Sequence, residues 1–191
     1  IRKAFALHVN GDQHLATVSQ YGTDEWRDSG FSFCVPSIAN HFPRKWVPNN
    51  KPDGDVLKTA QSNTGDYFDS FGNRLTMHAY VNPDKNRDKK YDGEWGLRAE
   101  GYGLIRFNTR SRKIKLECWP RGVDVATKPE QYTGWPVTID QLDNFNPRRW
   151  GKLGTLTFNK SSPVVQLLDS TTKEVIYTVR IKGTTFTPHA P

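Results

Sequence analysis

The chain has 191 residues, and its 27 Lys and Arg against 20 Asp and Glu give a net charge of +7 at neutral pH. Hydrophobic residues make up only 35% of the chain, whereas aromatic residues make up 12% and include six tryptophans. The aromatic content argues against disorder, and no window approaches the roughly 18 consecutive apolar residues of a membrane-spanning helix. We therefore expect a soluble globular protein with a hydrophobic core.

The two ends of the sequence indicate a fragment or a processed chain. The sequence opens at Ile1 without an initiator Met, and the only Met is Met77. No apolar segment of a signal peptide follows Ile1, and the C-terminal residues stop without a capped element.

Alternation of apolar and polar residues is far more frequent than helical spacing. This period of two predicts strands over residues 7–10, 15–21, 31–35, 75–81, 102–107, 113–119, 154–158, 164–168 and 174–181. Helix is expected only in residues 1–6 and 37–41. The fold class predicted from this pattern is mainly β.

Two stretches, residues 36–73 and 120–151, lack clear periodicity, and the second carries four of the twelve prolines. A long irregular stretch inside a compact domain usually marks a functional or site-covering loop. We predict two units: a core over residues 1–122, then an irregular linker and a small β-sandwich-like accessory module over residues 123–191.

Cys34 and Cys118 lie far apart in the sequence and form no CxxC pair. This spacing argues against zinc-ribbon and thioredoxin-type sites but leaves a single long-range disulfide open. Cys118 lies on the apolar side of its predicted strand, which indicates a core position.

The sharpest candidate site is the sequence Gly-Asp-Gln-His at residues 11–14, directly after an apolar strand-like run. Asp12 and His14 can point into one cleft there and offer a carboxylate oxygen and an imidazole nitrogen to a metal ion. A turn stabilised by an Asx hydrogen bond is the alternative, and spacing alone leaves both interpretations open.

Residues 11–14, followed by Phe-Ser-Phe-Cys-Val-Pro at residues 31–36, resemble the C-terminal part of the PhoD-like alkaline phosphatases of the calcineurin-like metallophosphoesterase superfamily. Supporting stretches are residues 101–107, 117–121 and 134–137. The resemblance implies the C-terminal half of a metallophosphoesterase-type β-sandwich core, with Asp12 and His14 as metal ligands. Asp12 stands at the first His position of the superfamily's Gly-His-x-His motif.

The same resemblance implies a hydrolase of phosphate mono- or diesters that uses a metal-bound water or hydroxide, with iron and calcium as cofactors and a periplasmic or secreted location. The superfamily's other metal motifs would lie upstream of Gly11, and only ten residues precede it. Asn40-His41-Phe42 lies downstream and lacks the acidic residue of the Asn-His-Asp/Glu motif. A two-metal site needs about half a dozen ligands. We therefore expect this chain to be inactive alone and to need its own N-terminal portion or a partner chain.

Arg44 and Trp46 lie on the long loop that follows. A cation and an indole near His14 can hold a phosphate and stack against a leaving group, so they are the candidate substrate-binding residues. In the alternative interpretation, Trp46 only anchors the loop to the core.

Other motifs are weaker. Asp84 to Asp88 matches the start of a calcium-binding loop, but Lys89 stands where Gly is needed and Trp95 where Glu is needed, which indicates a solvated turn. The basic residues of this run are interleaved with acids, so nucleic acid is not an expected partner.

A different class of function also fits the composition. Six tryptophans and a charge of +7 are compatible with a β-domain that binds a carbohydrate or a polyanion, because exposed aromatic rings stack on sugars and cations neutralise phosphates.

Overall fold

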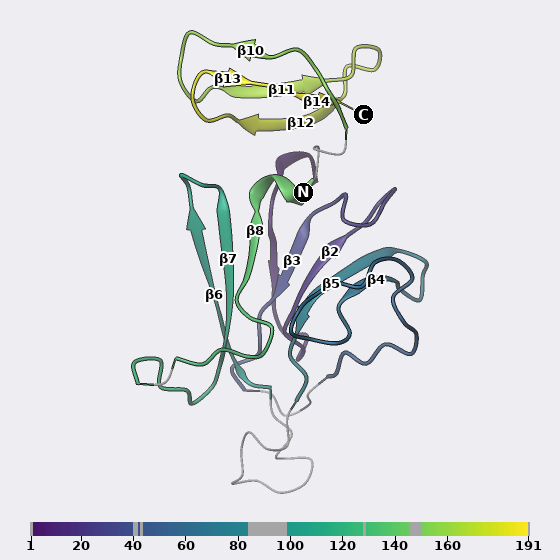
Figure 1. The fold of residues 1–191 in the computed structure, drawn as a ribbon, viewed down its shortest axis with the longest axis vertical. Coiled ribbons are helices and arrows are strands. Elements are labelled where there is room, and N and C mark those ends of the chain that lie inside the picture. Colours follow the sequence, from purple (N-terminus) through teal and green to yellow (C-terminus); the bar gives the residue numbers. More distant parts are fainter. Residues whose placement is uncertain are drawn as a thin grey trace, which may run out of the picture.

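A computed structural model describes residues 2–39, 42, 44–83, 99–127, 129–145 and 150–190. Strands make up 38% of the described residues and helix is almost absent among them, which confirms the predicted mainly β class (Figure 1). Within the described residues, the strands form several small sheets, none of them closed. In the same residues, no helix has the length and apolar character needed to cross a membrane.

The largest sheet has five strands in the order β1-β3-β2-β5-β4. Its members are β1 (His8–Asn10), β2 (Thr17–Tyr21), β3 (Phe31–Cys34), β4 (Gly65–Phe68) and β5 (Arg74–Tyr80). All neighbours are antiparallel except β1, which pairs in parallel with β3. The short strand β1 therefore forms one edge of this sheet.

The second sheet is an antiparallel meander of β6 (Gly101–Asn108), β7 (Lys113–Pro120) and β8 (Val137–Asp140). Strand β7 shows why the sequence favours this structure. Its residues Ile114, Leu116 and Cys118 are buried, whereas Lys113 and Lys115 on the other face are exposed or half-buried. A period of two is the spacing of a strand with one buried face.

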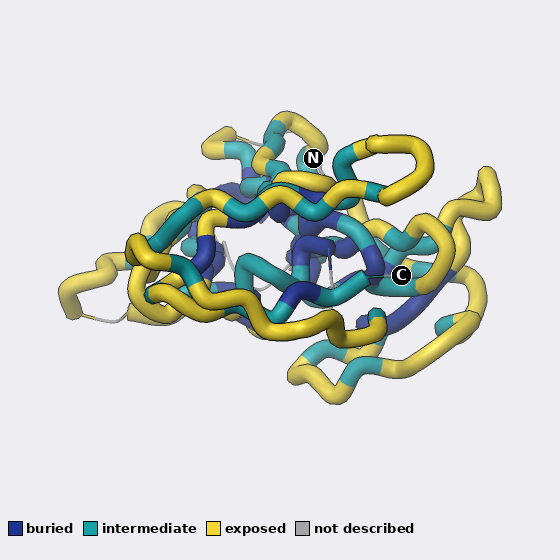
Figure 2. Tube along the Cα trace, turned by 90° about the horizontal axis from the view of Figure 1, so that it is seen from above, coloured by how far each residue is buried: buried dark blue, intermediate teal, exposed yellow. Residues whose placement is uncertain are grey.

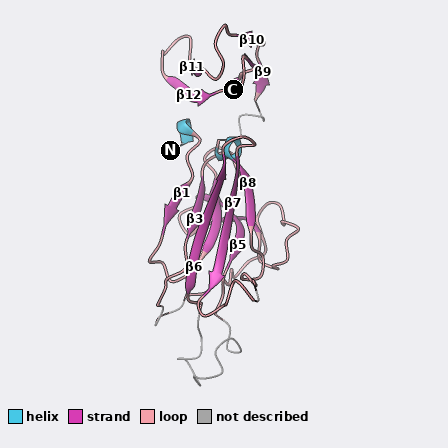
Figure 3. Cartoon of the chain, turned by 90° about the vertical axis from the view of Figure 1, so that its left-hand side faces the viewer, coloured by secondary structure: helices cyan, strands magenta, loops and turns pink. Residues whose placement is uncertain are grey.

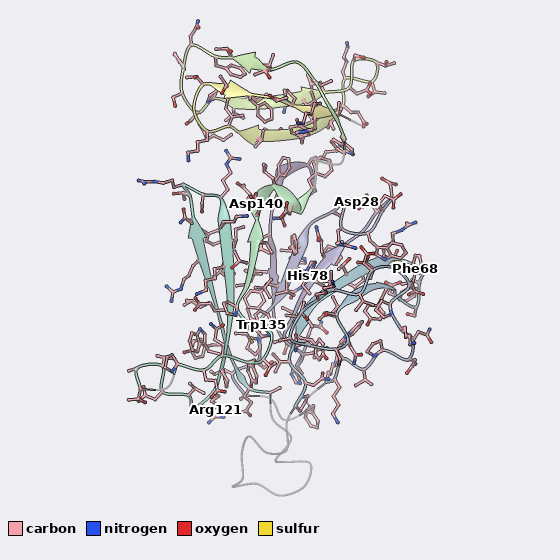
Figure 4. All side chains as sticks on the ribbon, viewed as in Figure 1. Asp28, Phe68, His78, Arg121, Trp135 and Asp140 are labelled. Carbon is pink, nitrogen blue, oxygen red and sulfur yellow. The ribbon has the colours of Figure 1, made fainter. Side chains whose placement is uncertain are left out.

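The two sheets pack face to face around one hydrophobic core. Val18 and Phe33 of the five-stranded sheet share this core with Leu116 of β7. The ring of Trp135 lies between the layers, 5.3 Å from the ring of Phe33 (Figure 4). Seen from above, the buried residues concentrate inside the molecule and the exposed residues form its rim (Figure 2). Both Cys34 and Cys118 are buried free thiols, so the disulfide left open by the sequence is not formed.

The C-terminal strands lie beyond one end of the two packed sheets (Figures 1 and 3). They form three antiparallel pairs: β9 (Gly151–Lys152) with β14 (His189–Ala190), β10 (Leu156–Thr157) with β13 (Thr185–Phe186), and β11 (Val164–Leu168) with β12 (Val175–Arg180). Their own core includes Tyr177 and Val179 and extends to Phe145 and to Phe5, which follows the 3₁₀ helix η1 (Arg2–Ala4).

Two stretches expected to be irregular each contain a strand, so this expectation was wrong there. Strand β4 lies within residues 36–73 and has the sequence Gly-Asp-Tyr-Phe. Glycine and aspartate are depleted in strands, but here the carboxylate of Asp66 is buried and bound by Arg27 and by Thr76, with a distance of 2.6 Å to each. Burial of this carboxylate is compensated by its partners.

Strand β8 and the 3₁₀ helix η3 (Gln141–Asn144) lie within residues 120–151, and β8 pairs with β7. Four residues are too short a run for periodicity to reveal a strand. Residues 37–39 are not helical, contrary to the expected helix over residues 37–41. The predicted division of the chain after residue 122 stays a prediction.

Candidate metal site

The loop that follows β1 carries two residues in a conformation that non-glycine residues seldom adopt. The φ angle is 61° at Asp12 and 55° at His14, both in the left-handed region. Such conformations cost free energy and persist only where the surrounding structure imposes them, and they cluster at functional sites. The loop is therefore held in a specific shape.

The imidazole of His14 has a defined hydrogen-bonding state. Its Nδ1 atom lies 2.9 Å from the main-chain oxygen of Phe42. Because a carbonyl oxygen only accepts, Nδ1 must carry the proton, and in the neutral ring Nε2 then presents a lone pair. Histidine ligands in metal sites are usually oriented in this way, with the second ring nitrogen bonded to a carbonyl or carboxylate.

Nε2 of His14 lies 3.6 Å from Oδ1 of Asp12. A neutral imidazole nitrogen and a carboxylate oxygen are both acceptors, so a cation or a proton between them stabilises the pair. The side chain of Asp12 is 98% exposed, which leaves its oxygens open to a further group. The donor set, one carboxylate oxygen and one imidazole nitrogen, fits part of a metal coordination shell.

Two ligands do not make a complete site. Within the described ranges, no group of three or more His, Cys, Asp or Glu residues is placed to hold a metal ion. Asp12 and His14 therefore make up only part of a metal site among these residues, and a complete site would need further ligands.

Arg44 lies beside this loop, as expected from the sequence. Its main-chain N–H donates to the main-chain oxygen of His14 at 3.1 Å, and its guanidinium donates to Oε1 of Gln13 at 2.9 Å. Both Gln13 and Arg44 line a cleft of about 280 Å³ on the face of the five-stranded sheet that points away from the core. The structure thus brings Arg44 and His14 together.

Trp46 lines the same cleft, but its polar groups have structural partners. Its indole N–H donates to the main-chain oxygen of Asn63 at 2.8 Å, and its main chain exchanges two hydrogen bonds with the amide of Asn82. Its ring packs edge-on against Tyr67 with centroids 5.3 Å apart. These contacts match the interpretation in which Trp46 anchors the loop.

Asn10, which is not among the residues predicted for the site, lines this cleft from the end of β1. Its Nδ2 donates to Oγ of Ser32 at 3.2 Å, whereas its Oδ1 is buried without a hydrogen-bond partner in the described residues. A buried acceptor of this kind is costly unless a water, an ion or a ligand satisfies it. The signal available in the sequence was the position of Asn10 as the last polar residue of the strand before Gly11.

Cys34 also lines the cleft, and burial raises the pKa of its thiol. The thiol is thus protonated at neutral pH and is a poor nucleophile.

His78 lies on the other face of the sheet, where its ring packs against Phe31 (Figure 4). Burial and then the charge of Arg27 lower its pKa to about 4, so it is neutral at physiological pH. Its Nε2 lies 3.3 Å from Oε1 of Gln20, which indicates a structural role for this histidine.

Two motifs from the sequence, the Asp84 to Trp95 run and His41, lie outside the described residues.

In comparisons with protein-family models, curated proteins and solved structures, the chain has no match. The fold and the site define a class by themselves: a mainly β protein of small packed sheets, with a carboxylate–imidazole pair on a constrained loop at the end of an edge strand.

Proposed function

We propose that this chain is the C-terminal part of a PhoD-like, metal-dependent phosphatase or phosphodiesterase with a metallophosphoesterase-type β-sandwich core. The observation that carries the proposal is the His14–Asp12 pair, with Nε2 and Oδ1 3.6 Å apart and Nδ1 committed to a carbonyl oxygen. The resemblance at residues 11–14 and the packing of the two sheets support it.

In this proposal, Asp12 and His14 each donate one ligand atom to a site completed by an upstream portion of the same protein or by a partner chain. Metal ions bound there, iron and calcium by the resemblance, would supply Lewis-acid activation of the phosphoryl group and of the attacking water. The Phe42 carbonyl holds the His14 ring so that Nε2 faces the site.

Arg44 is the proposed phosphate-binding residue. Its guanidinium is exposed. The guanidinium donates a hydrogen bond to the amide of Gln13, which is neutral and so does not neutralise the positive charge. Guanidinium groups bind phosphate oxygens through two parallel hydrogen bonds, which also fixes the orientation of the ester. Trp46 keeps the loop that carries Arg44 in place, since its indole bonds to Asn63. By the resemblance, the intact enzyme acts in the periplasm or outside the cell.

The proposal is tested by supplying the upstream portion and assaying bis(p-nitrophenyl) phosphate with added metal ions. Asp12→Asn and His14→Ala should each lower kcat/KM by about 100-fold or more, because each removes a metal ligand. His189→Ala, a half-buried histidine in a C-terminal strand, is the matched control and should leave the rate unchanged. Equal rates for wild type, Asp12→Asn and His14→Ala would exclude the assignment.

The alternative, a carbohydrate- or polyanion-binding β-domain, has less support. The tryptophans on which it rests and which the structure describes (Trp26, Trp46, Trp119, Trp135 and Trp150) are all half-buried or buried, and the exposed aromatic rings, such as Phe71 and Phe107, are not tryptophans.

A further inference from the structure

A second pocket is separate from the cleft beside His14. It has a volume of about 670 Å³ and lies where the tip of the β6–β7 hairpin, the N-terminal segment and β12 meet. Pockets that hold small organic ligands usually measure about 300–1,000 Å³. In Figure 1, this hairpin tip points toward the C-terminal strands.

Strand β1 separates the two cavities. Val9 lines the large pocket, whereas the next residue, Asn10, lines the cleft beside Gln13. Successive side chains of a strand point to opposite faces of the sheet. The large pocket therefore belongs to the face of the sheet opposite the cleft beside His14.

The floor of the large pocket is apolar. Val9 and Phe107 lie there with exposed fractions of 48% and 64%, and the more buried Ile114, Val179 and Ile181 extend the same surface. Exposed apolar side chains that share a concave surface with core residues are typical of a binding site for an apolar group.

The wall of the pocket is cationic. Arg112, Lys113, Arg180 and Lys182 line it, and none of the described lining residues is acidic. Lys113 is paired with Asp140, with Nζ 3.3 Å from Oδ2. The charges of the other three have no such compensation in their described contacts.

Each of these three cations donates a hydrogen bond to a different main-chain carbonyl oxygen. Arg112 donates to the oxygen of Arg180, Arg180 to that of Ser162 at 3.0 Å, and Lys182 to that of Arg110 at 3.0 Å. These carbonyl groups orient the three side chains but carry no net charge. The positive charges of the three cations on the pocket wall are therefore not neutralised by these contacts. Charge complementarity at this rim selects an anion.

The hairpin tip is rigid enough to define this rim. Oδ1 of Asn108 accepts the main-chain N–H groups of Arg110 and Ser111 at 3.1 and 2.9 Å, and the N–H of Arg112 donates to the main-chain oxygen of Asn108 at 2.8 Å. The main chain of Arg112 is therefore positioned by the turn, and its guanidinium by the hydrogen bond to Arg180, which limits the entropy lost on binding.

We propose that this pocket binds a single-chain anionic amphiphile, a long-chain carboxylate, with its head group on Arg112 and Lys182 and its alkyl chain over Val9 and Phe107. Arginine matches the two oxygens of a carboxylate, and the apolar floor removes the alkyl chain from water. This inference stands on residues other than those of the proposed metal site.

The test is calorimetric titration of the chain with laurate below its micelle concentration, at a pH where the carboxylate is ionised. We expect one saturable site. Arg112→Gln and Lys182→Gln should each weaken binding about tenfold, since each removes a charge-assisted hydrogen bond. Phe107→Asp should also weaken it, because it places a negative charge beside the alkyl chain, and its exposed position should not disturb folding.

Matched controls come from the same chain. Lys173 donates to the oxygen of Ser170 at 2.6 Å, as Lys182 does to that of Arg110, and Phe71 is 88% exposed on a different loop. Lys173→Gln and Phe71→Asp should bind laurate like the wild type. Uncharged dodecanol should bind at least tenfold more weakly than laurate. Absence of saturable binding, equal affinity for dodecanol, or wild-type affinity in both Lys182→Gln and Phe107→Asp would overturn the proposal.

Discussion

The imidazole of His14 and the carboxylate of Asp12 face each other with Nε2 and Oδ1 3.6 Å apart, and both residues have left-handed backbone conformations. A hydrogen bond between Nδ1 and the main-chain oxygen of Phe42 favours this orientation of the ring. The geometry presents two acceptor atoms to the same space. In the proposed metal site, these two atoms would be two of the ligands.

The close packing of the two sheets predicts the effect of a substitution at Gly103. A Cβ atom there would lie 2.7 Å from Cγ1 of Val35 and 2.8 Å from Cζ of Phe33. Gly103→Ala should therefore destabilise the fold by about 1–3 kcal/mol, measured by urea denaturation. The control Gly154→Ala, which meets nothing within 4 Å, should change stability little. A loss in Gly103→Ala no larger than that in Gly154→Ala would show that these contacts do not limit the residue at position 103.

The lowered pKa of His78 predicts that the protein loses stability in mild acid. Its pKa is lowered to about 4 by burial and by Arg27, with Asp66 acting in the opposite direction. The unfolded chain takes up this proton near pH 6.5, whereas the folded protein does not, so stability falls as the pH falls from 6.5 toward 4. Between pH 7 and pH 5, the expected loss is about 2 kcal/mol. His78→Gln should flatten this part of the curve and His189→Gln should not; identical curves for wild type and His78→Gln would contradict the assignment.

The lowered pKa of Glu117 predicts a further loss of stability at lower pH. Burial alone would raise its pKa, but the hydrogen bonds from Arg106, Lys115 and Trp119 together hold the pKa below its ordinary value of 4.5. The stabilisation is fully present above pH 4.5 and is lost as the pH falls through the lower, folded-state pKa. Glu117→Gln should cost about 1 kcal/mol at neutral pH and reduce the acid-dependent loss.

The matched control for Glu117 is Glu174→Gln, which changes an exposed glutamate. Thermal unfolding at pH 7 and at pH 3.5 is a sufficient measurement. An acid-dependent loss as large in Glu117→Gln as in the wild type would show that the loss arises elsewhere.

Two substitutions of Trp46 should lower stability by different amounts, because one removes only a hydrogen bond and the other also removes the packing of the ring. Trp46→Phe removes the 2.8 Å hydrogen bond to Asn63 and should cost about 1 kcal/mol, whereas Trp46→Ala also removes the packing on Tyr67 and should cost about 2–3 kcal/mol. In the control Trp26→Phe, the lost hydrogen bond to Tyr67 is longer, 3.5 Å, so urea denaturation should show a smaller effect. Equal losses for Trp46→Phe and Trp26→Phe would argue against the anchoring role of the indole.

The strands with clear alternation were predictable from the sequence. Residues 113–119 alternate apolar and charged side chains and form β7, and the buried thiol of Cys118 follows from the same pattern. Strand β4 was not predictable, because Gly65 and Asp66 are poor strand formers. The buried carboxylate of Asp66 is stabilised by partners distant in the sequence, Thr76 and Arg27, and Arg27 is 39 residues away.

The candidate site was predictable only in part. Asp12 and His14 are two positions apart, so their proximity follows from the sequence. The contact of His14 with Phe42 spans 28 residues, and Lys182 reaches the hairpin tip at Arg110 across 72 residues. Contacts of this kind depend on how the sheets and loops pack, which local periodicity does not encode.

The assignment of Asp12 and His14 as metal ligands can be checked by titrating the isotope-labelled chain with Mn²⁺ and following paramagnetic line broadening by NMR. A pair of ligands without the rest of a site should bind weakly. We expect broadening centred on His14 and Asp12 at Mn²⁺ concentrations of about 1 mM, and its loss in His14→Ala and in Asp12→Asn but not in His189→Ala. Broadening that is unchanged in His14→Ala and Asp12→Asn, or centred on other residues, would exclude these two residues as the ligands.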